Sequence, residues 1–265
     1  MGNGDGRTQR LQAAQEVARI AGKLLANRPD QGLQTATKGR NDFVTVMDVQ
    51  SEKLIKEYLH QRFPEDNFLG EEMGFEKYGD GGTWIIDPID GTTNYIHGLP
   101  GFTISIAYEE KRWNPVIGVV YDPTGDEMFA AQEGKGSYLN GKPISASTVG
   151  NPHETVIMIS PPLRKMQRMD DYMRMLEVLS KDSGEMRDYG SAALHLSYIA
   201  AGRAEAFIEF NLGYHDIAAG VVILAEAGGK ISPIDLGDLQ DWTSNIIATN
   251  DVLHSWFTRQ IQIPR

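Results

Sequence analysis

The chain has 265 residues, which is enough for one large domain or for two closely packed halves. Hydrophobic residues make up 41% of it, a fraction typical of globular proteins, and the formal net charge is −11. This charge argues against a nucleic-acid-binding role, because phosphate backbones are held by basic surfaces. The absence of cysteine excludes disulfides, thiolate nucleophiles and cysteine-ligated zinc.

Two further features bear on targeting. Residues 1–10 begin with a glycine-rich, polar stretch that lacks the apolar core of a signal peptide, and we expect a disordered lead-in there. No run of about 18 apolar residues occurs in the chain, so we expect no membrane span. A cytoplasmic location is the resulting default expectation.

The first part of the chain combines two amphipathic helices with a block of strands. Apolar residues at helical spacing predict helices over residues 11–25 and 48–62. Short apolar runs predict strands at residues 83–86, 102–108, 116–121, 127–132 and 136–139. Asn140-Gly141, directly after the last of these runs, is a typical hairpin turn.

Strands and helices alternate after residue 145. The pattern predicts strands at residues 155–159, 204–210 and 245–249. It predicts helices at residues 170–179, 192–201, 217–227 and 252–260. We therefore expect an α/β (α+β) protein with two halves, residues 11–145 and 146–265, that share a deep cleft.

The most informative stretch for function is Asp87-Pro88-Ile89-Asp90-Gly91-Thr92-Thr93, directly after a short apolar run. Two carboxylates at the end of a buried strand are costly to leave unpaired, so such groups pair with cations or bind a metal. Pro88 favours an extended conformation for Asp87, which lets both carboxylates face one point. Gly91 lets a ligand approach the backbone, and the threonines after it offer hydroxyl and N–H groups suited to a phosphate.

The residues alone leave other interpretations of this stretch open. An Asp-Pro-x-Asp-Gly stretch is also compatible with a simple turn capped by aspartate side chains. Calcium binding is a further option, although the regularly spaced ligands of an EF-hand loop are missing.

Three more acidic positions are candidates for the same chemistry: Glu71 in Gly70-Glu71-Glu72, Asp48, and Asp216 in His215-Asp216-Ile217. Each has a simpler alternative, because glutamate pairs are often solvated and the two aspartates are suitable N-caps for the helices that follow them. All of these groups are oxygen ligands for hard cations, and no histidine or cysteine spacing indicates zinc.

Together these segments resemble the inositol monophosphatase family of magnesium-dependent, lithium-sensitive phosphatases. The segments that carry the likeness, in chain order, are residues 42–48, 70–72, 84–97, 216–220 and 226–229. Residues 84–97 are similar to the family's first motif along its whole length, and the last two segments are similar to its second motif. The likeness runs from about residue 11 to residue 250, which is nearly the whole chain.

The resemblance implies a five-layered α/β/α/β/α sandwich and a site for two to three Mg²⁺ ions. Glu71, Asp87 and the backbone carbonyl of Ile89 would hold the first ion. Asp87, Asp90 and Asp216 would hold the second, and Glu71 would also touch a weaker third ion through water.

The resemblance also implies roles in catalysis and substrate binding. Thr92, paired with Asp48, would orient and deprotonate the attacking water, while Glu71 would act through the metals. The backbone N–H groups of Gly91 and Thr92 would hold the phosphate. The full set of implied substrate-binding residues is Gly91, Thr92, Asp90, Ala192 and Glu209.

Two positions depart from the family pattern or extend it. The family has tryptophan before the aspartate of the second motif, whereas this chain has His215. His215 either packs there as a planar ring or modulates Asp216 and contacts substrate, which would add a pH dependence near neutrality. Lys38 resembles part of a mobile loop that closes over the metals, and a solvated basic loop is the alternative.

The resemblance favours inositol 1-phosphate as the substrate. Thr92-Thr93-Asn94 resembles the inositol branch of the family, and the carboxylate of Glu209 suits inositol hydroxyls better than a second phosphate. Related enzymes act on fructose 1,6-bisphosphate, 3′-phosphoadenosine 5′-phosphate or histidinol phosphate, and these substrates remain alternatives.

A non-catalytic module that binds a partner protein is an alternative of a different class, because a fold does not by itself imply a function.

The resemblance also implies a homodimer. We expect neither nucleic acid nor membrane as a partner.

Overall fold

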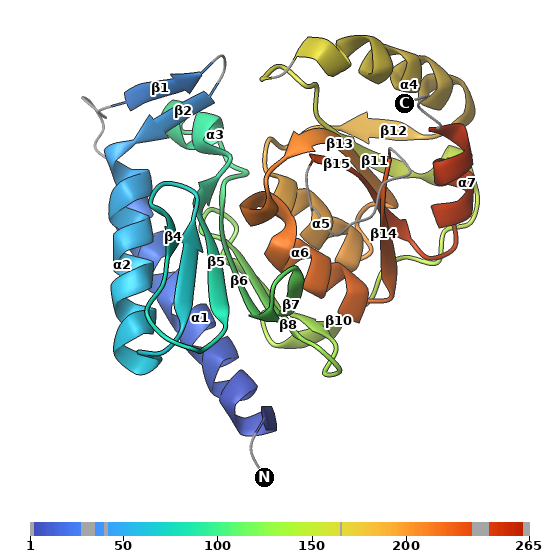
Figure 1. Ribbon diagram of the computed structural model, residues 1–265. Coiled ribbons are helices and arrows are strands. Elements are labelled where there is room, and N and C mark those ends of the chain that lie inside the picture. Colours follow the sequence, from blue (N-terminus) through green and yellow to red (C-terminus); the bar gives the residue numbers. More distant parts are fainter. Residues whose placement is uncertain (1–2, 28–34, 40–41, 165, 235–243, 262–265) are drawn as a thin grey trace.

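The computed structural model describes residues 3–27, 35–39, 42–164, 166–234 and 244–261. Its helices and strands form five layers, helices alternating with sheets, as Figure 1 shows from one edge of the stack. The five-layered sandwich expected from the resemblance is thereby confirmed. Among the described residues, no helix combines the length and apolar character needed to cross a membrane.

The first two layers come from the first half of the chain. Helices α1 (Asn3–Ala26) and α2 (Val46–Arg62) cover one face of an eight-stranded sheet with strand order β10-β9-β8-β7-β6-β5-β3-β4. The strands are β3 (Asn67–Gly70), β4 (Gly74–Glu76), β5 (Thr83–Asp90), β6 (Thr103–Lys111), β7 (Asn114–Asp122), β8 (Glu127–Gln132), β9 (Ser137–Leu139) and β10 (Lys142–Ile144). Only β3 and β5 pair in parallel, and all the other neighbours in this sheet are antiparallel.

The last three layers come from the second half. Helices α5 (Ala192–Ala200) and α6 (Tyr214–Glu226) lie between the two sheets and share one apolar core with both. The second sheet has the order β12-β11-β13-β15-β14. Its strands are β11 (Val156–Ile159), β12 (Glu185–Arg187), β13 (Ala206–Leu212), β14 (Gly229–Pro233) and β15 (Ser244–Asn250). Helices α4 (Met169–Asp182) and α7 (His254–Gln260) cover its outer face.

Smaller elements complete the chain. A hairpin of β1 (Thr35–Gly39) and β2 (Asp42–Thr45) precedes α2, and the short helix α3 (Thr92–His97) follows β5. Two 3₁₀ turns, Pro152–Glu154 and Met166–Arg168, lie on either side of β11. In Figure 1, the β1–β2 hairpin and α3 lie at the same end of the first half.

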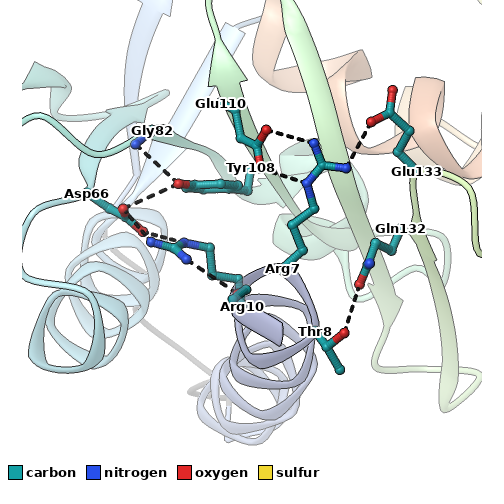
Figure 2. A network of polar contacts seen from close by, with 10 residues as sticks. Arg7, Thr8, Arg10, Asp66, Gly82, Tyr108, Glu110, Gln132 and Glu133 are labelled. Carbon is teal, nitrogen blue, oxygen red and sulfur yellow. Dashed lines mark hydrogen bonds and ion pairs between the residues drawn. The ribbon is translucent and has the colours of Figure 1, made fainter. Parts of the chain in front are cut away.

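The N-terminal segment differs from the disordered lead-in expected for residues 1–10, because α1 already begins at Asn3. Two arginines anchor this part of α1 to the sheet (Figure 2). Arg7 binds Glu110 through two nitrogens and also contacts Glu133. Glycine-rich composition alone could not show these contacts, since their acidic partners are more than a hundred residues away in the chain.

Arg10 makes the more deeply buried of these contacts. Its Nε and Nη2 atoms donate to the two carboxylate oxygens of Asp66 at 2.8 Å each, and Asp66 is almost fully buried. The indole N–H of Trp84 also donates to Asp66, at 3.1 Å. The guanidinium lies over the rings of Phe63 and Tyr108, 4.6 and 4.7 Å from their centres. The Asp66 carboxylate is therefore shielded from water, and both members of the pair are satisfied by hydrogen bonds.

The two halves approach each other closely where α6 crosses the first sheet. A Cβ atom added to Gly118 of β7 would lie 2.2 Å from the carbonyl oxygen of Ala219 in α6. This distance is far below van der Waals contact, so only glycine fits between this strand and this helix. The close approach brings the start of α6 toward the end of β5, where the candidate site lies.

Arg10→Ala should lower the free energy of unfolding by about 3 kcal/mol, because it leaves the buried Asp66 carboxylate without its cation. Urea denaturation followed by circular dichroism measures this change. The matched control is Arg19→Ala, which removes an exposed pair with Asp126 and should cost about 1 kcal/mol or less. Equal losses in the two variants would contradict the assignment of Arg10 as the anchor of α1.

Candidate active site

The end of β5 supplies two carboxylates to one point. In a regular strand, side chains three residues apart point to opposite faces. The pairing of β5 with β6 is irregular between Asp87 and Asp90, where β5 carries one residue more than β6, so the alternation is broken. One carboxylate oxygen from each aspartate then lies within 4.8 Å of the other.

Asp216 of α6 joins them from the other half of the chain. Ligand atoms of Asp87, Asp90 and Asp216 all lie within 4.8 Å of one another. Asp216 is the third residue of its helix, and its Oδ2 accepts a hydrogen bond from the backbone N–H of Gly213 at 2.5 Å. The simpler interpretation of Asp216 as the N-cap is therefore wrong, because Gly213 occupies the cap position.

The carboxylates repel one another in a largely buried site. Burial, followed by the charges of Glu71, Asp90 and Asp216, raises the pKa of Asp87 well above its usual range. Burial and the charge of Asp216 raise the pKa of Asp90 to about 7. Glu71 follows β3, which pairs in parallel with β5, and this pairing places it beside Asp87.

This donor set fits a hard divalent cation. Mg²⁺ and Ca²⁺ prefer carboxylate and carbonyl oxygens, and the cluster offers no nitrogen or sulfur donor among the residues that make it up. A bound cation would offset the repulsion that raises these pKa values. Glu71, Asp87, Asp90 and Asp216 are thus the carboxylates of the structure that could hold the Mg²⁺ ions implied by the resemblance.

A threonine and an aspartate form the second part of the site. The Thr92 hydroxyl lies 3.2 Å from Oδ1 of Asp48 and 2.9 Å from the carbonyl oxygen of Ile89, so its one proton has two alternative acceptors. The other oxygen of Asp48 accepts from the backbone N–H and the hydroxyl of Thr45, at 2.7 and 2.6 Å. Asp48 is fully buried, and this burial raises its pKa.

These contacts also correct the simpler interpretation of Asp48. Thr45 is the N-cap of α2, and Asp48 is the third residue of the helix, where its side chain bonds back to the cap. Sequence spacing did not separate the two positions, because both suit an aspartate near the start of a helix.

The first turn of α5 is fastened to Asp90. Oδ2 of Asp90 accepts hydrogen bonds from the Ser191 hydroxyl and from the backbone N–H of Ala193, both at 2.7 Å. Ala192 lies between these two donors and lines the cavity beside the cluster. The structure thus places Ala192 beside Asp90, two of the residues expected to bind substrate.

A cavity of about 430 Å³ opens beside the carboxylate cluster. Its wall includes Asp90, Gly91, Ala192, Glu209 and Asp216, together with Asp188, Arg164 and others. Glu209 projects from β13, and burial, followed by the charges of Asp216 and Asp90, raises its pKa well above the usual range. Both halves of the chain therefore contribute to the same cavity.

Gly91 turns the chain between β5 and α3. Its φ angle of 91° lies in the left-handed region that favours glycine. A Cβ atom at this position would lie 2.9 Å from the carbonyl oxygen of Gly101 and 3.1 Å from that of Gly190. A larger residue is therefore excluded both by backbone conformation and by space.

Of the two positions that depart from the family pattern or extend it, the structure describes the side chain of His215 but not that of Lys38. The His215 ring packs against Gly213, with its Nε2 atom 3.5 Å from Oδ1 of Asp216, so packing and contact with Asp216 occur together. Lys38 belongs to β1, and its side chain lies outside the part of the chain that the structure describes.

Sequence analysis did not find the residues that hold the loop before α5. Asn94 donates to the carbonyl oxygens of Gly101 and Tyr189, at 2.8 and 2.6 Å. The fully buried His195 accepts from the backbone N–H of Tyr189 at 2.9 Å, and burial lowers its pKa to about 3. Asn94 lies in the motif of residues 84–97, whereas nothing in the sequence around His195 distinguishes it from an ordinary helix residue.

Comparison with known families gives one decisive match. The model of the inositol monophosphatase family matches residues 7–263. The chain belongs to the inositol monophosphatase family. This assignment confirms the family resemblance of the motifs, and the carboxylate cluster lies at the end of the strand that carries the first of them.

Family members similar to this chain have two kinds of name. The chain is 38% identical over 244 residues to the Nus factor SuhB of Escherichia coli, covering 91% of each protein. It is 37% identical over 246 residues to the inositol-1-monophosphatase of Caulobacter vibrioides, covering 90% of this chain and 95% of that one. Among solved structures, the IMPase of Thermotoga maritima is similar with a TM-score of 0.86 and 34% identity, covering 96% of each chain.

Without metal, the protein should become less stable as the pH rises from about 4 to about 7, because the folded pKa of Asp90 is about 7 and lies above the unfolded value. The folded cluster holds its protons more tightly than the unfolded chain, and this stabilisation is lost when they dissociate. Mg²⁺ should therefore raise the melting temperature more at pH 8 than at pH 5. Thermal unfolding with EDTA or Mg²⁺ measures the difference.

Asp90→Asn is the control for this pH effect, since other groups also titrate in the same range. Removing one of the mutually repelling carboxylates should flatten the decline of stability with rising pH in EDTA. It should also reduce the increase in melting temperature that Mg²⁺ causes. An equal gain from Mg²⁺ at both pH values in the unmodified protein would contradict the assignment of this cluster as a metal site.

Proposed function

We propose that this member of the inositol monophosphatase family hydrolyses a small phosphate monoester with the help of Mg²⁺, and that inositol 1-phosphate is its substrate. The observation that carries the proposal is the meeting of Asp87, Asp90 and Asp216 beside a cavity that the two halves line together. Family membership supports phosphatase activity in general, and the named inositol-1-monophosphatase relative supports the inositol substrate.

The metal ligands in this proposal are Glu71, Asp87, Asp90, Asp216 and the carbonyl oxygen of Ile89. When bound, two or three Mg²⁺ ions would neutralise the phosphate, lower the pKa of a coordinated water and stabilise the leaving oxygen. The cluster carries several negative charges in a confined space, so without cations a phosphate dianion would be repelled from it.

Thr92 and Asp48 orient the attacking water and accept its proton in the proposed reaction. The Thr92 hydroxyl can donate to Asp48 while its oxygen accepts from the water, which fixes the direction of the lone pair. Asp48 is held rigidly by Thr45 and has one oxygen directed at Thr92, so the pair is organised before substrate binds. The backbone N–H groups of Gly91 and Thr92 hold the phosphate at the start of α3.

The alcohol part of the substrate occupies the side of the cavity formed by Asp90, Ala192 and Glu209. Carboxyl and backbone groups suit the hydroxyls of a cyclitol better than a second phosphate. This placement supports inositol 1-phosphate over fructose 1,6-bisphosphate and 3′-phosphoadenosine 5′-phosphate. We also propose a homodimer and a cytoplasmic location, on the strength of the family resemblance.

A second candidate function follows from the names of the relatives. Several proteins similar to this chain, including that of Escherichia coli, are named Nus factor SuhB. A role as a Nus factor would be a function other than phosphate hydrolysis. An Asp87→Asn chain that has lost hydrolysis but keeps such a role would show that the two functions are separate.

Thr92→Val should lower kcat by about 10²-fold or more, because it removes the hydroxyl that orients the water and leaves the fold intact. Thr92→Ser, which keeps the hydroxyl, is the matched control and should retain most of the activity. Phosphate release under saturating Mg²⁺ measures both. Equal activity in the valine and serine variants would contradict the role assigned to the hydroxyl.

A panel of substrates tests the specificity. Phosphate release from inositol 1-phosphate should exceed that from fructose 1,6-bisphosphate, 3′-phosphoadenosine 5′-phosphate and histidinol phosphate, and should disappear with EDTA. Asp87→Asn, which removes a central ligand, should abolish turnover of every member. A different preferred substrate would overturn the inositol assignment while leaving the reaction class, and turnover that persists in EDTA would overturn the metal dependence.

A further inference from the structure

Glu52 is a buried carboxylate that the proposed reaction does not use. It lies in α2, fully buried, on the side of the helix that faces the sheet. Burial raises its pKa, while two backbone hydrogen bonds and the charge of Lys56 act in the opposite direction. A buried carboxylate of this kind is held only where specific donors compensate for its loss of water.

Those donors belong to the turn that follows the metal-ligand candidate Glu71. Oε2 of Glu52 accepts from the backbone N–H of Glu72 at 2.8 Å, and Oε1 accepts from the N–H of Met73 at 3.0 Å. The two oxygens of one carboxylate thus bind two consecutive peptide groups, and the first of these peptide groups joins Glu71 to Glu72. The direction of this turn determines where Glu71 points.

The space around this carboxylate is equally specific. A Cβ atom added to Gly70 would lie 1.9 Å from Oε1 of Glu52. The turn can therefore approach α2 closely only because residue 70 has no side chain. The sequence Gly70-Glu71-Glu72 and the buried Glu52 fit together as one unit.

Lys56, one turn further along the helix, holds the far side of the same turn. Its ammonium group forms an ion pair with Glu76 of β4 and lies 3.6 Å from the sulfur of Met73. Glu52 therefore fastens the β3–β4 turn to α2 through two backbone amides, and Lys56 fastens the following strand β4 to the same helix through Glu76.

The same helix also holds the rest of the site. Asp48, which contacts Thr92, lies one turn before Glu52, and the hydroxyl of Ser51 donates to the carbonyl oxygen of Pro88 at 3.4 Å. One face of α2 thus contacts the β5–α3 connection through Asp48 and Ser51 and the Glu71 turn through Glu52. A rigid helix that touches both segments fixes their separation.

We propose that Glu52 is a positioning residue that holds Glu71 against Asp87 and thereby sets the affinity of the site for divalent cations. The inference rests on the proposed function, because it takes Glu71 as a metal ligand. Glu52 itself touches neither metal nor substrate. Partners that orient metal ligands typically change affinity about 10- to 100-fold when they are removed.

Two substitutions separate positioning from charge. Glu52→Gln keeps the length of the side chain but places an NH₂ group against one of the two N–H donors. Glu52→Asp keeps the charge but is one methylene too short to reach both donors. Both variants should bind Mn²⁺ at least about 10-fold more weakly, as measured by electron paramagnetic resonance titration of the whole protein. The Mg²⁺ concentration for half-maximal activity should rise similarly, whereas kcat at saturating Mg²⁺ should change much less.

Glu57→Gln is the matched control, since it makes the same substitution on the exposed side of the same helix. It should leave Mn²⁺ affinity unchanged. Amide hydrogen exchange of the metal-free protein supplies a readout that does not depend on activity. The N–H groups of Glu72 and Met73 should be protected in the unmodified protein and should exchange faster in both Glu52 variants, while amides of β13 stay as they were.

Several outcomes would overturn the inference. Unchanged Mn²⁺ affinity in both Glu52 variants would show that the turn holds Glu71 without help. Weak binding by Glu52→Gln together with normal binding by Glu52→Asp would show that charge alone matters. Rapid exchange of the Glu72 and Met73 amides in the unmodified protein would also overturn the inference, because it would show that Glu52 does not hold the turn. This measurement does not require the variants to fold. Failure of the unmodified protein to bind Mn²⁺ would instead refute the proposed metal site, and the inference with it.

Discussion

Mutual repulsion among buried carboxylates is the constraint around which this protein is organised. The charges of Glu71, Asp90 and Asp216 lie close enough to Asp87 to raise its pKa, and no isolated segment of the chain would keep these carboxylates together. The fold does so because each residue lies on or next to a strand or helix whose backbone is hydrogen-bonded and packed independently of the cluster. The strain in the cluster is therefore sustained by the packing of two sheets and the helices between them.

The supporting contacts are short and local, although the residues come from distant parts of the chain. Asp90 fastens the start of α5, Asp48 closes the start of α2, and Asp216 bonds back to Gly213 before α6. In each case one carboxylate oxygen accepts a hydrogen bond from the backbone at the start of a helix. Helix termini favour negative charge, so these positions offset part of the repulsion.

Much of the site could be predicted from the sequence, because its acidic residues occur in compact motifs that resemble those of one family. The strand block and most of the long helices were also predictable from apolar periodicity. The exact helix starts were not, since an aspartate at the cap and one three residues later look alike in sequence. Glu52 and His195 gave no signal, because the groups that they bind are backbone amides, which every residue carries. The short strands β4, β12 and β14 were not predicted, and they are held in the sheets by pairing with β3, β11 and β15.

Gly118 shows how little clearance separates the two halves. Its opposite neighbour is the backbone of Ala219, which cannot rotate aside as a side chain would. A single methyl group there would push α6 away from the sheet, and Asp216 would retreat from the two aspartates that β5 carries. The distance between the aspartates of the two halves therefore depends on the absence of a side chain at Gly118, two strands away from β5. A substitution at this interior position, which touches no substrate, would alter the reaction.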